Sequence, residues 1–141
     1  MFTSRTAVDV RYAETDQMGI VYHANYLVWM EIGRTRLIED LGFSYAKMEE
    51  DGILSPVVDL QVEYKKPLRY GQKAEIHTRV KEYTGIRVSY EYEMFTPDGE
   101  LAIKASSSHV CVKKETFRPI NIKKHFPDWD AAYRNAAGSG I

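Results

Sequence analysis

The sequence predicts an α+β fold in which a curved antiparallel sheet of about five strands wraps around one long central helix. One observation is the order of the elements, a single strand followed by one long apolar helix and then four strand-like segments. Another is that residues 25–41 contain no proline and are followed by Gly42, a residue that commonly ends a helix. The third is the length of 141 residues, which suits a single domain over residues 1–141.

The first strand and the long helix follow from hydrophobic spacing. Apolar and charged residues alternate over residues 8–12, which predicts a strand that ends near Asp16. The helix over residues 25–41 carries apolar residues on more than one side, so we expect it to be buried on more than one side. Gly33 in its middle would let a sheet approach the helix backbone closely.

The rest of the chain is expected to be mostly strand. Ser44 can cap a short helix that runs to Asp51 and ends at Gly52. Apolar residues then alternate with polar ones over four predicted strands, at residues 58–64, 74–83, 86–94 and 101–112. We expect a bulge at residues 106–108, a weak terminal helix over residues 123–134 interrupted by Pro127, and a frayed end over residues 136–141.

Composition argues against several classes of function. Nineteen Lys and Arg against twenty Asp and Glu give a net charge of -1, so the attraction expected of a nucleic-acid-binding protein is missing. No run reaches the roughly 18 to 20 apolar residues needed for a membrane span. A single cysteine, Cys111, and a polar N-terminal segment indicate a cytoplasmic protein. The histidines and Cys111 show no metal-ligand spacing, so no metal site is predicted.

The segment that joins the first strand to the helix carries the candidate chemistry. Asp16 follows a strand end, Gly19 permits a tight turn, and backbone N–H groups around His23 open the helix, where negative charge is favoured. A carboxylate beside an oxyanion site suits transfer of an acyl group to water. A thioester fits these groups, because a thiol with a pKa of roughly 8 to 9 leaves without a strong acid or a metal. The same spacing is compatible with Asp16 merely capping a turn.

The segment also resembles a known family. Glu14-Thr15-Asp16, Gly19 and the run from Val21 to Tyr26 stand as in the hotdog-fold acyl-CoA thioesterases of the YbgC and 4-hydroxybenzoyl-CoA thioesterase type, and the similarity extends over residues 5–125. This resemblance implies a hotdog fold and hydrolysis of an acyl-CoA to the free acid and coenzyme A. It places the catalytic carboxylate at Asp16 and the oxyanion donor at the backbone N–H near His23.

Further site residues and partners are implied by the same resemblance. Tyr22 and His23 match other site positions, and Gly19 is expected at the substrate. Coenzyme A is part of the substrate, so no separate cofactor is expected. Hotdog relatives place the substrate between protomers, which implies a homodimer or a homotetramer built as a dimer of dimers.

Several side chains keep two interpretations. The His23 imidazole either serves the site or is a hydrogen-bonded core residue, and Tyr22 either lines the site or packs at a dimer interface. The cations Lys65, Lys66 and Arg69 either meet the phosphates of coenzyme A or are solvated strand ends. On the helix, Glu31 and Arg34 are expected to form an i,i+3 ion pair rather than to act in catalysis.

Two other functions remain open at the level of sequence. A non-catalytic module that binds acyl-CoA or acyl-carrier protein would keep the basic residues without needing Asp16. A dehydratase or hydratase acting on an acyl thioester would need the side chains of Asp16 and His23 to converge on one substrate carbon.

Overall fold

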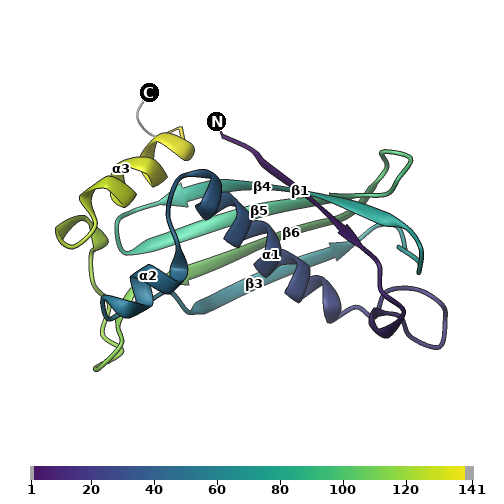
Figure 1. Ribbon diagram of the computed structural model, residues 1–141, viewed down its shortest axis with the longest axis horizontal. Coiled ribbons are helices and arrows are strands. Elements are labelled where there is room, and N and C mark those ends of the chain that lie inside the picture. The colour runs from purple at the N-terminus through teal and green to yellow at the C-terminus, as the bar shows by residue number, and fades with distance from the viewer. Residues whose placement is uncertain (1, 139–141) are drawn as a thin grey trace.

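The computed structural model describes residues 2–138. A five-stranded antiparallel sheet packs against a long helix (Figure 1), and residues 53–54 pair with residues 112–113 in a small second sheet. The elements in chain order are β1 (Ser4–Asp9), α1 (Asn25–Asp40), α2 (Tyr45–Glu50), β2 (Ile53–Leu54), β3 (Val57–Tyr64), β4 (Lys73–Tyr83), β5 (Arg87–Phe95), β6 (Leu101–Val110), β7 (Val112–Lys113) and α3 (Pro127–Ala136). The strand order in the sheet is β1-β4-β5-β6-β3. The α+β arrangement expected from the sequence is therefore confirmed. No helix within residues 2–138 has both the length and the apolar character needed to cross a membrane.

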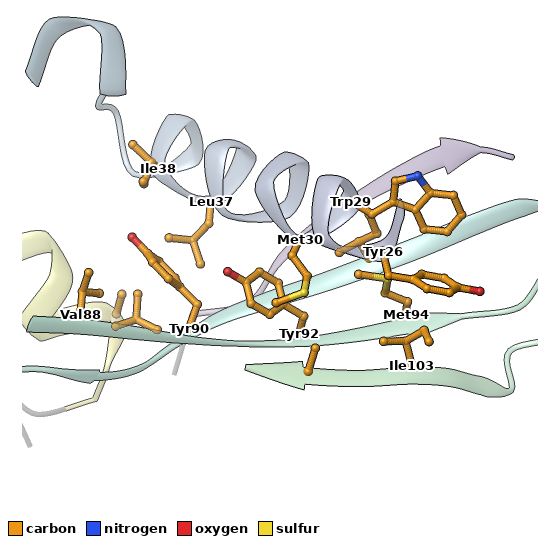
Figure 2. Close-up of a cluster of buried hydrophobic side chains, with 14 of the residues drawn as sticks. Tyr26, Trp29, Met30, Leu37, Ile38, Val88, Tyr90, Tyr92, Met94 and Ile103 are labelled. Atoms are coloured by element: carbon orange, nitrogen blue, oxygen red, sulfur yellow. The ribbon is translucent and has the colours of Figure 1, made fainter. Parts of the chain in front are cut away.

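Helix α1 lies across one face of the sheet and forms the core with it. Figure 2 shows Tyr26, Met30 and Leu37 of α1 directed toward the side chains of β5, which include Tyr90 and Tyr92. These side chains are almost completely buried. Burial of aromatic and aliphatic surface of this extent is the main favourable contribution to the stability of such a domain.

The opposite side of α1 is partly exposed, so the expectation that this helix is buried on more than one side is wrong. Leu27, Val28 and Ile32 are 38%, 48% and 39% exposed, so a single chain buries the helix on one side only. The physical reason is that the sheet covers one face, and no other part of residues 2–138 covers these three residues. The apolar residues there stay available for contact with another molecule.

Gly33 confirms the predicted close approach between helix and sheet. A Cβ atom at this position would lie 2.5 Å from Thr78 Oγ1 and 3.0 Å from Ile76 Cγ2, both on β4. Any side chain here would push α1 away from the sheet. The glycine thus sets the depth at which α1 packs, and with it the position of the helix N-terminus.

The strands differ from the sequence prediction at the end of β1 and at the expected bulge. Strand β1 ends at Asp9, and Tyr12 lies instead in a short 3-10 turn with 77% of its surface exposed. The expected bulge at Ser106–Ser108 is wrong, because all three serines pair in regular register with β5. The register shifts lie at Val58 in β3, at Lys81 in β4, and between Met94 and Phe95 of β5, opposite Ala102 of β6.

The C-terminal region also differs. Pro127 begins α3 rather than interrupting a helix, since the first helical position needs no N–H donor. Ala136, expected to open a frayed tail, is buried within α3. Residues 139–141 of that expected tail lie outside the described residues.

Candidate active site

A cavity of about 380 Å³ opens where the loop after β1, the start of α1 and the end of β3 meet. Its wall is mainly apolar and carries a few charged and polar groups. It is lined by Asp16, Met18, Ile20, Val21, His23, Tyr26, Tyr64, Lys65, Lys66 and Pro67. The fold therefore brings Asp16, His23 and two of the three predicted cations to one place, although up to 50 positions separate them in the sequence.

The loop that carries Asp16 is closed on itself. The Asp16 amide donates to the carbonyl of Ile20 at 2.9 Å, and the Gly19 amide donates to the carbonyl of Asp16 at 2.9 Å. Gly19 has a φ of +81°, which explains why a glycine stands at this turn. These bonds fix the backbone of Asp16 relative to the cavity.

The Asp16 carboxylate uses only one of its two oxygens in this loop. Oδ1 accepts a hydrogen bond from the Met18 amide at 2.8 Å, the turn contact that the simpler interpretation of Asp16 predicts. Oδ2 accepts no hydrogen bond from any residue in the 2–138 range. Holding the turn and presenting a reactive oxygen are thus compatible roles of the same side chain.

The start of α1 supplies hydrogen-bond donors beside this carboxylate. The helix begins at Asn25, and the preceding residue, Ala24, makes no side-chain cap. Within the described part of the chain, the amides of His23 and Ala24 donate to no other group. Such amides at the N-terminus of a helix are suited to stabilise negative charge on a ligand. The carbonyl of His23 accepts a hydrogen bond from the Tyr64 hydroxyl at 3.2 Å, which ties the end of β3 to this helix start.

Glu14 is a residue near the site to which the sequence analysis assigned no role. Its side chain is buried, with Oε1 accepting from the Arg11 amide and Oε2 from the Trp29 indole, each at 2.8 Å. Burial alone raises the pKa of Glu14, but these hydrogen bonds outweigh burial and hold the pKa below its ordinary value. No pattern in the sequence distinguishes such a carboxylate from an exposed one, because its partners lie at unrelated spacings.

His23 and Tyr22 lie at the rim rather than in the core. Both side chains are exposed, and their rings contact each other at a centroid distance of 4.3 Å. Of the two interpretations of His23, the one that makes it a core residue does not fit this exposure. His23 lines the cavity, whereas Tyr22 does not. No hydrogen bond joins Asp16 to the His23 ring among the described residues, so the pairing that a dehydratase requires is not observed.

The predicted cations divide into two groups. Lys65 and Lys66 line the cavity, and each forms an exposed ion pair, Lys65 with Glu63 at 3.6 Å and Lys66 with Glu100 at 2.6 Å. Exposed pairs of this kind are weak and exchange readily for another anion.

Two other predicted substrate contacts lie outside this wall. Arg69 contributes a backbone bridge to Ile20, and Gly19 lines a neighbouring hollow with the exposed rings of Tyr12 and Tyr70.

The expected Glu31–Arg34 ion pair is not formed in the part of the chain that the structure describes. Arg34 instead interacts with Tyr92 under the helix, and its neighbour Arg36 pairs with Asp40 at 3.0 Å. The i,i+3 spacing therefore predicts the wrong partner for Arg34, because burial beside a tyrosine competes with an exposed ion pair.

Other reactive groups are not placed for chemistry. Burial raises the pKa of the Cys111 thiol to about 11, so its thiolate is scarce near neutral pH. Within residues 2–138, no group of three His, Cys, Asp or Glu side chains is arranged to hold a metal ion. Among the described side chains at the cavity, Asp16 is thus the strongest candidate for a base or nucleophile.

Known proteins share both the sequence and this architecture. Residues 10–129 match the thioesterase-like superfamily. The chain is 60% identical over 136 residues to the "Putative acyl-CoA thioesterase YneP" of Bacillus subtilis, which covers 96% of this chain and 99% of that protein. It is 28% identical over 120 residues to the acyl-CoA thioester hydrolase YbgC of Escherichia coli, covering 85% of this chain and 90% of YbgC.

A crystal structure of a DHNA-CoA thioesterase from Staphylococcus aureus is similar along nearly the whole chain. Its TM-score is 0.96 at 46% sequence identity, covering 99% of this chain and 94% of the other. The resemblance to YbgC-type thioesterases stated from the signature over residues 14–26 is thereby confirmed.

Proposed function

Because this chain belongs to the thioesterase-like superfamily, we propose that it is a thioester hydrolase that converts an acyl-CoA to the free acid and coenzyme A. The observation that carries the proposal is that Asp16, whose Oδ2 accepts no hydrogen bond among residues 2–138, lines a mainly apolar cavity together with His23 at the start of α1. The names of the relatives support the same reaction.

The chemistry needs three contributions from these groups. The acyl group enters the apolar cavity, with the thioester oxygen directed toward the His23 amide. Water or a carboxylate oxygen bonds to the carbonyl carbon, and negative charge then grows on the thioester carbonyl oxygen. The His23 amide and the helix dipole stabilise this charge. The carbon–sulfur bond then breaks, the electron pair leaves with sulfur, and the thiolate takes up a proton from solvent.

Asp16 has two possible roles in this sequence. As a general base it removes a proton from water while the water oxygen attacks the carbonyl carbon. As a nucleophile it bonds to that carbon, expels the thiolate and leaves a mixed anhydride, which water then hydrolyses. A single turnover in oxygen-18 water separates the two routes. Label incorporated into Asp16 supports an anhydride that water opens at the Asp16 carbonyl, whereas a general base leaves Asp16 unlabelled, as does an anhydride that water opens at its acyl carbon.

The cations at the rim would hold the coenzyme A part of the substrate. Lys65 and Lys66 stand at the mouth of the cavity, and phosphate groups bind Lys and Arg through charge-assisted hydrogen bonds. Arg69 and Gly19, which lie outside this wall, are kept in the proposal only as neighbours that a long substrate could reach. Tyr22 is likewise an outer residue that contacts His23 rather than the cavity.

The acyl class is best tested with aromatic thioesters first. The cavity wall includes the rings of Tyr26 and Tyr64, whose centroids are 5.8 Å apart, and DHNA, the acid in the name of the similar S. aureus enzyme, is aromatic. The experiment measures thiol release from DHNA-CoA, benzoyl-CoA and short- and long-chain acyl-CoAs. Faster turnover of the aromatic thioesters supports the assignment. Binding of acyl-CoA without turnover of any member would instead identify a non-catalytic binding module.

A second copy of the chain belongs to the proposed enzyme. Among residues 2–138, β3 pairs with one strand only, and Val58 and Leu60 on it are 51% and 41% exposed. An exposed apolar edge strand is a site for pairing with another chain. We infer a homodimer through this edge, a homotetramer through the apolar outer side of α1, and a cytoplasmic location for the assembly.

A further inference from the structure

Glu14 connects the two parts of the candidate site through both its main chain and its side chain. Its carboxylate accepts the amide of Arg11, at the end of the first strand region, and the indole of Trp29 in the second turn of α1. Its carbonyl accepts the Tyr22 amide and the Asn25 side-chain amide, each at 2.8 Å. One buried residue thus contacts chain positions before the Asp16 loop, after it and within the helix.

These contacts enclose the reactive groups. The loop from Thr15 to Val21, closed by a backbone bridge between these two residues, begins directly after Glu14 and returns to it at Tyr22. The next residue along the chain is His23, whose amide is free. Bonds that converge on Glu14 therefore help to hold the Asp16 carboxylate relative to that amide, together with the bonds inside the loop and those that join Ile20 and Val21 to residues 68–69.

We propose that Glu14 is a positioning residue of the thioesterase site, whose buried carboxylate holds the Asp16 loop against the first turns of α1. The inference rests on the proposed function for its effect on catalysis. This role requires no contact between Glu14 and the substrate, since Glu14 does not line the cavity. Displacement of a reacting group by about 1 Å lowers the rate by roughly 100-fold, so an enzyme gains from such a support.

The carboxylate form is what the environment requires. Both side-chain oxygens accept from N–H donors, and a glutamine at this position would turn its NH₂ group toward one of them. Two donors facing each other in a buried place repel and leave both unsatisfied. Glu14→Gln is therefore a change of nearly constant volume that breaks one of the two hydrogen bonds and removes the charge that pairs with the Arg11 guanidinium at 3.4 Å.

The test compares Glu14→Gln with Asp130→Asn. Asp130 is a matched control, because it is also a buried carboxylate with two side-chain donors, Tyr83 and Arg134, but lies in α3 away from the cavity. We expect Glu14→Gln to lower kcat roughly 10- to 100-fold with a much smaller change in KM. Asp130→Asn should lower thermal stability while leaving kcat unchanged.

Amide hydrogen exchange provides a readout that does not depend on activity. In Glu14→Gln, residues 15–24 should exchange faster than in the wild type, while β4, β5 and β6 keep their protection. Unchanged exchange over residues 15–24, or an unchanged kcat in an active enzyme, overturns the inference. If the wild type hydrolyses no thioester, the proposed function fails, and the exchange result still decides whether Glu14 holds the loop.

A second variant covers the case in which Glu14→Gln does not fold. Trp29→Phe keeps an aromatic ring in the core and removes the indole N–H that Glu14 accepts, together with part of the buried ring. Like Glu14→Gln, it should raise the amide exchange rate over residues 15–24 and lower kcat. Because both changes act on the contacts of the same carboxylate, the double variant should lose less activity than the product of the single losses. Independent, multiplying losses would contradict the coupling.

Discussion

Asp16 and Glu14 are carboxylates two positions apart in the sequence, and the structure gives them opposite environments. Glu14 is buried with both oxygens bonded to N–H donors, whereas Asp16 is half-buried with Oδ2 free at a cavity. The sequence predicted Asp16 as a site residue because it follows a strand end and precedes a helix. It could not separate the role of Glu14, because that role depends on Trp29, fifteen positions away, meeting it in space.

Lys66 provides a test of substrate binding. Replacing Lys66 by Ala should raise KM for acyl-CoA roughly 10-fold and leave kcat unchanged, because a charge-assisted bond to phosphate is lost. The same variant should not alter KM for an acyl-pantetheine, which lacks the nucleotide phosphates. Lys73→Ala is the control, since Lys73 pairs with Asp9 away from the cavity. Equal changes in KM for both substrates would contradict phosphate binding at Lys66.

His109 predicts a pH dependence of stability. It is buried, its Nε2 contacts Ser107 Oγ at 2.9 Å and its Nδ1 contacts the Ser55 carbonyl at 3.2 Å. Burial, followed by the nearby charge of Arg34, lowers the pKa of His109 from 6.5 to about 4. Below pH 6.5 His109 therefore becomes protonated in the unfolded chain, whereas in the folded chain it stays neutral down to about pH 4.

The free energy of unfolding should consequently fall by roughly 3 kcal/mol from this residue as pH drops through that window. Glu14 and Asp130, with lowered pKa values, lose stabilisation only below their ordinary values of 4.5 and 3.8. Urea unfolding between pH 7 and pH 4.5 should therefore show the His109 effect, and His109→Gln should flatten the slope. An unaltered slope in that variant would assign the pH dependence to other groups.

Among the secondary-structure elements, α1 shows what hydrophobic spacing can predict and what it cannot. The absence of proline over residues 25–41 and the glycine that follows predicted the helix to within one residue, because these signals are local. The number of covered sides was predicted wrongly, because it depends on what packs against the helix. Pro127 shows the same limit, since a proline favours both a break and a first helical position.

Gly33→Ala tests the depth of α1 on the sheet. Although alanine favours helix formation, its Cβ would meet Thr78 Oγ1 at 2.5 Å, so we expect a loss of about 1 to 3 kcal/mol in unfolding free energy. Adding Thr78→Ala should recover part of this loss, because it removes the contacting hydroxyl, which has no hydrogen-bond partner. Glu39→Ala on the exposed side of α1 serves as the control. A Gly33→Ala protein as stable as the wild type would contradict the close packing.

At the scale of the whole molecule, the order of elements was sufficient to predict the fold class. One strand, one apolar helix and a run of antiparallel strands leave few ways to cover both the helix and a sheet face. The cavity was harder to foresee, because its wall combines the Asp16 loop with residues 64–67 at the end of β3. Only the sheet order, which places β3 at an edge beside the helix start, brings these segments together.

The exposed edge of β3 predicts the oligomeric state. Leu60→Lys should halve the mass of the assembly, measured by sedimentation equilibrium, because a charge replaces an apolar contact on the pairing strand. If the site is shared between protomers, turnover should fall with it. Ala7→Lys on the opposite edge strand, β1, is the control. A Leu60→Lys protein that keeps the wild-type mass and activity would place the interface elsewhere.

The proposed reaction is hydrolysis of a bound thioester with the Asp16 carboxylate as general base or nucleophile. The most direct measurement is single-turnover thiol release with enzyme in excess, comparing the wild type with Asp16→Asn on the best acyl-CoA, with acyl-CoA binding and folding measured for both. We expect Asp16→Asn to fold and to bind acyl-CoA like the wild type but to release thiol roughly 100- to 10,000-fold more slowly. Release at the wild-type rate by folded Asp16→Asn would show that another group performs the reaction.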